Sequence, residues 1–97
     1  MKGTRVYPNK KGFLDHAAMS VPGAYGRATA EQLKGTSLEW WQLTTPDGHM
    51  GCLDPKIHTV IEHDDGTITV APSIDMSKRH PGAYHGFLRN GEWTTSM

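Results

Sequence analysis

Six histidines in a chain of 97 residues are the side chains best suited to chemistry. His58 and His63, like His80 and His85, have the separation of paired zinc ligands. That separation brings ligands together on a helix, whereas both pairs lie in sequence typical of strands and turns. On a strand, an odd separation directs two side chains to opposite faces. The histidines could meet around a metal only through tertiary folding, so we predict no metal site and no cofactor.

Other candidates for catalysis have simpler structural explanations. Cys52 precedes Leu53 in a strand-like segment, where a single cysteine is typically a small buried hydrophobe. Asp64 and Asp65 lie at a turn, where aspartate bonds the backbone. The chain has no nucleophile elbow, phosphate loop, dinucleotide fingerprint or zinc-protease motif. We therefore expect a protein that is not an enzyme.

A binding site is the remaining possibility for these side chains. Trp40 and Trp41 point to opposite faces if they lie in a strand, so the outward one, taken as Trp40, is free to contact a ligand. His49, His58 and His85 are expected at strand ends, and imidazole both donates and accepts hydrogen bonds near neutral pH. We predict a ligand site made by these four residues; the alternative is that the histidines only close off strand ends.

A second candidate is a cationic patch. Lys78, Arg79 and His80 are consecutive and could bind an anionic ligand together with Arg89. The alternative interpretation is a solvated loop.

Composition and charge limit the class of protein. The chain is 36% hydrophobic and 21% charged, and its length suits one domain. Ten basic residues balance ten acidic ones, so nucleic acid is not an expected partner. The basic N-terminus lacks the apolar stretch of a signal peptide, and no apolar run approaches the roughly 20 residues that cross a bilayer. We expect a cytoplasmic protein without a membrane partner, with its single cysteine reduced.

Turn signals define the elements that must position these residues. Three turns contain Gly48, Gly66 and Gly91, each directly after Asp or Asn, and each predicts a β-hairpin with glycine at positive φ. The resulting registers pair Trp41 with Leu53, Val60 with Val70, Glu62 with Ile68, Arg89 with Glu92 and Leu88 with Trp93. The side chains that then share faces predict the core, which is Trp41, Leu43, Leu53, Val60, Ile68, Val70, Leu88 and Trp93.

The first part of the chain has a different texture. Residues 1–36 are rich in glycine and proline and are predicted to form an irregular N-terminal arm. A short helix is expected near residues 29–34, capped by Thr29 and ended by Gly35. Residues 37–97 are predicted to form the antiparallel β domain. The predicted fold is mainly β, a small antiparallel sandwich or half-open barrel of about five to seven strands with at most one short helix.

One short segment occurs twice. Pro-Gly-Ala-Tyr stands at residues 22–25 and again at residues 81–84. Pro-Gly is a type II turn signal, and the tyrosine two residues later could anchor the strand that leaves the turn. The flanking sequences do not match, so the repeat indicates a turn used twice rather than a duplicated fold.

The segment from residue 40 to residue 93 resembles a poorly characterised family of small bacterial and phage proteins. The matching pieces are Trp41-Gln42-Leu43, Thr45-Pro46-Asp47-Gly48-His49, Thr69-Val70-Ala71-Pro72-Ser73-Ile74 and Tyr84-His85-Gly86-Phe87-Leu88-Arg89-Asn90-Gly91-Glu92-Trp93. Some members carry Cys-Pro-x-Cys-Gly at the turn, which indicates a metal knuckle, whereas this chain has no cysteine there. The resemblance implies a phage or mobile-element context, hence the host cytoplasm, and no established activity.

These observations favour a non-catalytic binding module. Its expected partner is a host protein or a small polar ligand, and a homo-oligomer is compatible with the sequence. The alternatives are a minor structural or assembly protein of a virion, with the glycine-rich arm as an interchain tether, and a small metal-dependent hydrolase built on convergent histidines.

Overall fold

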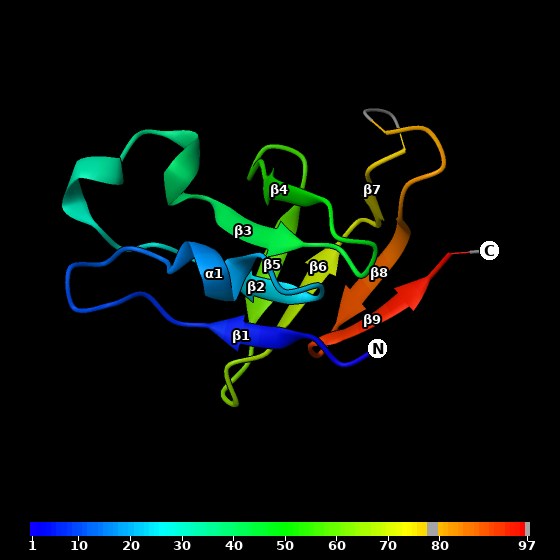
Figure 1. The fold of residues 1–97 in the computed structure, drawn as a ribbon, viewed down its shortest axis with the longest axis horizontal. Coiled ribbons are helices and arrows are strands. Elements are labelled where there is room, and N and C mark those ends of the chain that lie inside the picture. The colour runs from blue at the N-terminus through cyan, green and yellow to red at the C-terminus, as the bar shows by residue number, and fades with distance from the viewer. Residues whose placement is uncertain (78–79, 97) are drawn as a thin grey trace.

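The computed structural model describes residues 1–77 and 80–96, whose strands form three small sheets (Figure 1). The mainly β fold is therefore confirmed, and the described strands form no closed barrel. The strands are β1 (Thr4–Val6), β2 (Ala24–Gly26), β3 (Trp41–Thr44), β4 (Met50–Leu53), β5 (Thr59–Glu62), β6 (Ile68–Ala71), β7 (Ile74–Asp75), β8 (His85–Arg89) and β9 (Glu92–Thr95). The sheets have the orders β1-β2-β3-β4, β5-β6 and β7-β8-β9.

The three predicted hairpins are confirmed as β3–β4, β5–β6 and β8–β9. Their registers pair Trp41 with Leu53, Val60 with Val70, Glu62 with Ile68, Leu88 with Trp93 and Arg89 with Glu92, all as expected. Gly48, Gly66 and Gly91 have φ of 91°, 86° and 75°. Turn chemistry thus set the pairing of these strands, because only glycine takes such φ values without a Cβ penalty.

The first 36 residues differ from the irregular arm that was expected. β1 pairs in parallel with β2, and β2 pairs antiparallel with β3, so this region supplies half of the four-stranded sheet. Glycine permits the close approach, since a Cβ added to Gly26 would lie 2.5 Å from the carbonyl oxygen of Val6. Gly26, one of the glycines that indicated an irregular chain, thus allows tight strand packing, and this region is folded rather than a free tether.

The helical segments are short and more numerous than predicted. They are α1 (His16–Met19) and the 3₁₀ turns η1 (Glu31–Leu33) and η2 (Ser37–Glu39). The helix expected near residues 29–34 is therefore η1, which begins after Ala30 rather than after a Thr29 cap. α1 was not predicted; the Asp15 side chain caps it by accepting from the backbone N–H of Ala18 at 3.2 Å. No helix in residues 1–77 and 80–96 is long and apolar enough to cross a membrane.

The core joins all three sheets. Of the predicted core, six residues are buried and two, Trp41 and Val60, are half-buried and pack against the others. Sequence reasoning missed three buried members of this cluster, Tyr25, Ile74 and Tyr84. The two tyrosines are those of the repeated Pro-Gly-Ala-Tyr segment, and the glycines of both copies have positive φ. The repeated turn therefore places a core tyrosine twice.

Trp93 ties the N-terminus to the last hairpin. Its indole Nε1 donates to the carbonyl of Gly23 at 3.0 Å, and its backbone N–H donates to the carbonyl of Met1 at 2.8 Å. The N–H of Gly3 in turn donates to the carbonyl of Gly91 at 2.7 Å. The N-terminus is consequently held beside β9, as Figure 1 shows.

The β5–β6 hairpin lies across the four-stranded sheet. Figure 1 shows β5 and β6 running behind β2 and β3 and crossing their direction. The buried side chains of Ile68 and Val70 in β6 belong to the same cluster as Leu43 in β3. This crossing leaves β5 next to the end of the sheet at which β3 begins, and that is where the site lies.

Candidate functional site

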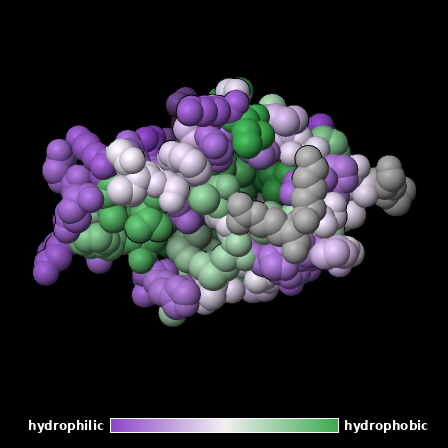
Figure 2. Space-filling model, turned by 90° about the horizontal axis from the view of Figure 1, so that it is seen from above, coloured by the Kyte–Doolittle hydropathy of each residue, from purple (hydrophilic) through white to green (hydrophobic). Residues whose placement is uncertain are grey.

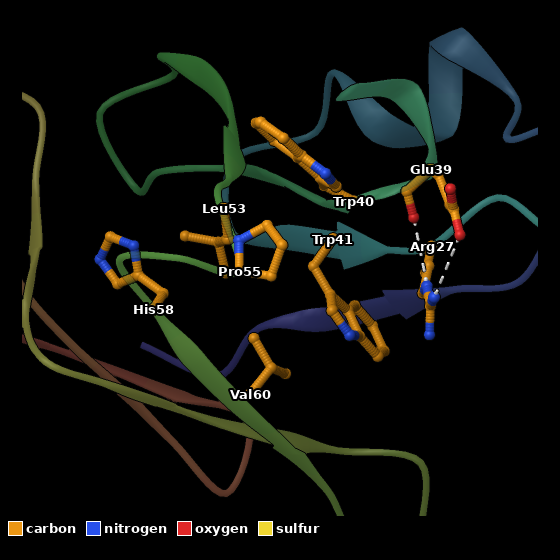
Figure 3. Close-up of a pocket in the computed structure, with 8 residues that line it drawn as sticks. All are labelled: Arg27, Glu39, Trp40, Trp41, Leu53, Pro55, His58 and Val60. Atoms are coloured by element: carbon orange, nitrogen blue, oxygen red, sulfur yellow. Dashed lines mark hydrogen bonds and ion pairs between the residues drawn. The ribbon is translucent and has the colours of Figure 1, made fainter. Parts of the chain in front are cut away.

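A pocket of about 390 Å³ lies between the end of the four-stranded sheet and β5. Its volume falls in the range of small-molecule sites. Its lining combines apolar and aromatic surface with three polar side chains (Figure 3). The lining residues are Arg27, Glu39, Trp40, Trp41, Leu53, Pro55, His58 and Val60.

The two tryptophans form the middle of this pocket. Trp40 follows η2 and Trp41 begins β3, and the two rings point to opposite sides of the chain (Figure 3). One was expected in the core and the other outside, but both are half-buried and both line the pocket. Trp41 also packs against the core cluster. Trp40 thus lies at the pocket but is half-buried instead of outward, and Trp41 lines the same pocket. Ligand contact by Trp40 stays a prediction.

Arg27 and Glu39 close one end of the pocket. Arg27 follows Gly26, which pairs with Gln42 beside Trp41, so the β2–β3 pairing brings Arg27 to the site. Its Nε donates to the backbone carbonyl of Glu39 at 3.2 Å, and its Nη2 lies 4.0 Å from the Glu39 carboxylate. The Arg27 side chain is 50% exposed, so part of its guanidinium remains available to an anion.

His58 closes the opposite end of the pocket (Figure 3). Its Nε2 lies 3.3 Å from the carbonyl oxygen of Ser73, and because a carbonyl only accepts, Nε2 carries the proton. The other ring nitrogen, Nδ1, is buried without a hydrogen-bond partner among the described residues. The His85 Nε2 lies 3.2 Å from the Ser73 hydroxyl. Ser73 therefore joins two of the predicted site residues, although His85 does not line the pocket.

A second pocket of about 460 Å³ lies on the other side of Trp41 and shares Arg27 and Glu39 with the first. Arg5 from β1 places its guanidinium 4.8 Å from the Trp41 ring centroid and 4.4 Å from that of Tyr7. The same guanidinium donates to the Glu62 carboxylate at 2.9 Å. Cation–π contacts and this ion pair hold Trp41 in place as the wall between the two pockets.

His49 lies in a separate cluster rather than at the pocket. Its Nδ1 is 3.2 Å from the Asp47 carboxylate, and its ring stacks on that of His80 with 4.3 Å between centroids. The Asp47 carboxylate also accepts from the Thr45 hydroxyl and from the backbone N–H of Tyr84. Burial opposes ionisation of Asp47, but these hydrogen bonds outweigh it and lower the pKa of the carboxyl group. Asp47 thus ties the first hairpin turn to Tyr84, directly before β8, and His49 belongs to that structural contact.

An apolar hollow of about 320 Å³ lies between α1, η1, η2 and the β3–β4 hairpin. Leu38 and Met50 border it and are 54% and 48% exposed. Figure 2 shows hydrophobic side chains among hydrophilic ones at the end of the molecule that carries the 3₁₀ turns, and further hydrophobic side chains over its middle. The pattern of the sequence did not predict this hollow, because its residues come from separate segments of the chain.

Three further candidates from the sequence are the metal site, the cationic patch and Cys52. Among residues 1–77 and 80–96, no three side chains of His, Cys, Asp or Glu are grouped so that they could hold a metal ion. Lys78 and Arg79 of the proposed cationic patch lie outside the described residues. Cys52 is exposed, unlike the buried cysteine that was expected.

Comparison with protein-family models, with curated proteins and with solved structures finds no match. The resemblance to small phage and bacterial proteins therefore stays a prediction. The site must be interpreted from its own geometry.

Proposed function

We propose that this domain is a non-catalytic binding module whose ligand occupies the pocket between Trp40, Trp41 and His58. The observation that carries the proposal is the lining of that pocket, in which two half-buried tryptophans stand between Arg27 and His58. Exposed aromatic surface flanked by a few convergent polar groups is typical of ligand sites.

The chemistry of the pocket favours a planar group that bears a negative charge. The indole rings offer stacking surface, and Arg27 offers guanidinium N–H donors. The host-protein and small-ligand interpretations share this chemistry, because a protein partner presents the same groups on its side chains. A phage or mobile-element origin remains part of the proposal and rests on the sequence resemblance alone.

Nitrogen-15 NMR titration with benzoate, indole-3-acetate and adenosine monophosphate tests the proposal. We expect at least one of these planar anions to shift the signals of Trp40, Trp41 and His58. Arg27→Ala should weaken that binding by about tenfold, the value of one charge-assisted hydrogen bond. Arg89→Ala is the matched control, since Arg89 stacks on Phe87 at 4.2 Å and does not line the pocket. Shifts confined to the apolar hollow, or equal effects of both substitutions, would count against the proposal.

The apolar hollow supports a second candidate, a structural or assembly role in which copies of the chain associate. Exposed Leu38 and Met50 beside a concave apolar surface suit contact with another protein. Sedimentation of the wild type and of Leu38→Lys tests this role. A concentration-dependent oligomer that Leu38→Lys dissociates would favour assembly, whereas a monomer at all concentrations would exclude self-assembly through this surface.

A further inference from the structure

The outer edge of β5 carries backbone groups that β6 does not pair. The N–H of His63 donates to the carbonyl of Thr67 at 2.8 Å, which makes these residues a hydrogen-bonded pair. Such pairs alternate along an antiparallel ladder, so Ile61 is the next residue of β5 that bonds β6. The N–H and C=O groups of Val60 and Glu62 therefore point away from β6. Among the described strands, β6 is the only one paired with β5.

The two pockets lie along this same edge. Val60 lines the first pocket, Glu62 lines the second, and Trp41 stands between them. Residues two apart in a strand are about 7 Å apart and direct their side chains to the same face. A strand added beside β5 would thus place side chains i and i+2 at the two pockets.

The two pockets differ in the polarity of their linings, so each would accept a different kind of side chain from an added strand. The first has Trp40, Leu53 and Pro55, which suit a large apolar or aromatic group. The second has three cations, Arg5, Arg27 and Lys34, and two carboxylates, Glu39 and Glu62, among its lining residues. Arg5 is paired with Glu62, so Arg27 and Lys34 are the cations left for a ligand. Among the described residues, the ion pairs of Arg27 and Lys34 are exposed, at 4.0 Å to Glu39 and 3.1 Å to Glu31, and such pairs contribute little. Arg27 keeps its Nε hydrogen bond to the Glu39 carbonyl at 3.2 Å. An incoming carboxylate can therefore compete for either cation.

We propose that β5 binds an extended polypeptide as an added antiparallel strand, with an acidic residue opposite Glu62 and an aromatic residue opposite Val60. The inference rests on the proposed function and narrows its ligand to a peptide with the order acidic-x-aromatic. Strand addition supplies affinity through the main chain and specificity through alternate side-chain pockets. Only a polypeptide presents the backbone donors and acceptors that match both Val60 and Glu62.

A second copy of β5 fits this edge poorly in the register centred on Ile61. A two-fold antiparallel pair centred on Ile61 would place Glu62 of one copy opposite Val60 of the other, at the apolar pocket. Moreover, Glu62 is already paired with Arg5 at 2.9 Å, and Val60 packs against the core. The occupant is therefore a different chain.

The test uses synthetic peptides and amide exchange in the full-length protein. The probe is acetyl-Lys-Thr-Glu-Thr-Phe-Thr-Lys-amide, and its control is acetyl-Lys-Thr-Thr-Glu-Phe-Thr-Lys-amide, which has the same composition but adjacent Glu and Phe. We expect the probe to bind at least about tenfold more tightly and to slow amide exchange at Val60 and Glu62. N-methylation of the probe's Glu or Phe should abolish binding, whereas N-methylation of the threonine between them, whose N–H points away from β5, should preserve it.

Two variants of the protein examine the same edge. Glu62→Pro and Glu62→Ala both remove the ion pair with Arg5. Only proline also removes the outward N–H of residue 62, and it still leaves the ladder bonds of Ile61 and His63 intact. Binding of the probe should be about tenfold weaker in Glu62→Pro than in Glu62→Ala. Backbone amide spectra verify that both variants fold. If the proline variant does not fold, the N-methylated peptides alone decide whether the probe adds to β5 as a strand.

The outcomes separate this inference from the function on which it rests. Binding of planar anions at Trp40, without slowed exchange at Val60 and Glu62 by any peptide, would leave the binding module standing and overturn strand addition. Equal binding of the two N-methylated forms, or of the probe and its spacing control, would also overturn it. Self-association through β5 would overturn it in favour of a dimer. Binding of neither anions nor peptides would remove both proposals.

Discussion

The two parts of this chain pair their strands in different ways. The strands β3 to β6, β8 and β9 form hairpins with their neighbours in sequence, across turns that contain glycine. β1 instead pairs in parallel with β2, across a connection that includes α1, and the first three residues contact β9 and its turn. A tight turn specifies its own pairing, whereas long connections leave the partner to be decided by the folded whole. The difference explains why one part was predicted and the other was not.

The largest expected effect concerns Trp93, which connects the first 36 residues to the last hairpin. Trp93→Ala removes a side chain that is 2% exposed and whose Nε1 donates to Gly23 at 3.0 Å. We expect the free energy of unfolding to fall by about 3–5 kcal/mol, measured by urea denaturation. Trp40→Ala, which truncates a half-buried tryptophan outside the core cluster, should cost clearly less. Similar losses of unfolding free energy in both variants would show that the contacts of Trp93 are not central to stability.

A second substitution tests the parallel pair. Gly26→Ala would place a Cβ 2.5 Å from the Val6 carbonyl oxygen, so β1 and β2 must separate. We expect the free energy of unfolding to fall by about 1–3 kcal/mol, as for overpacked sites. The control is Gly35→Ala, because nothing lies within 4 Å of a Cβ added at Gly35.

Gly35→Ala isolates the cost of backbone conformation from the cost of a clash. Gly35 has φ of 83°, so alanine there should cost about 1 kcal/mol from the left-handed backbone alone. Thermal or urea unfolding of the two variants measures the difference. A Gly26→Ala protein no less stable than Gly35→Ala would contradict the close approach of β1 and β2.

A third substitution concerns a long-range contact within the hairpin region. The Asp47 carboxylate accepts from the N–H of Tyr84 at 2.9 Å, and its pKa is lowered because its hydrogen bonds outweigh its burial. A lowered folded-state pKa contributes stability that is present above the ordinary value of 3.8 and is lost as the pH falls through the folded pKa. Asp47→Asn should cost about 1 kcal/mol at neutral pH and reduce the loss of stability in acid.

The acid dependence should be reduced rather than abolished in Asp47→Asn. The side-chain and backbone hydrogen bonds from Thr67 also lower the pKa of Asp65, so that carboxylate contributes in the same pH range. Asp54→Asn is the control, since the Asp54 carboxylate accepts from the N–H of Lys56 within its own turn, at 2.9 Å. Unfolding curves between neutral pH and acid compare the wild type and the two variants. If Asp47→Asn loses as much stability in acid as the wild type, Asp47 does not contribute to the acid dependence.

The smallest effect on stability is expected where the two parts meet at the pocket. Arg27 comes from the first 36 residues and is 50% exposed, so Arg27→Ala should change the free energy of unfolding by less than about 0.5 kcal/mol. The same variant should bind planar anions about tenfold more weakly, as measured by NMR titration. A large loss of stability with unchanged binding would assign Arg27 to the fold instead of the site.

The candidate site was predictable only in part. Trp40 and His58 were predicted and both line the pocket, while His85 reaches it only through Ser73. His49 was grouped with them because it also ends a turn, but its carboxylate partner and His80 hold it elsewhere. Arg27 was missed because its place depends on the β2–β3 pairing, for which the sequence has no turn signal.

The amino-acid sequence by itself determined the three hairpins, their registers and most of the core. Those features depend on glycine at turn positions and on alternation along strands, both of which act over a few residues. The tertiary structure alone decided that β1 and β2 join the sheet, that Tyr25 and Tyr84 are buried, and that Arg27 lines one pocket with Trp41 and His58. These contacts join segments far apart in the chain, and their formation depends on side-chain packing and close backbone approach that no local pattern specifies.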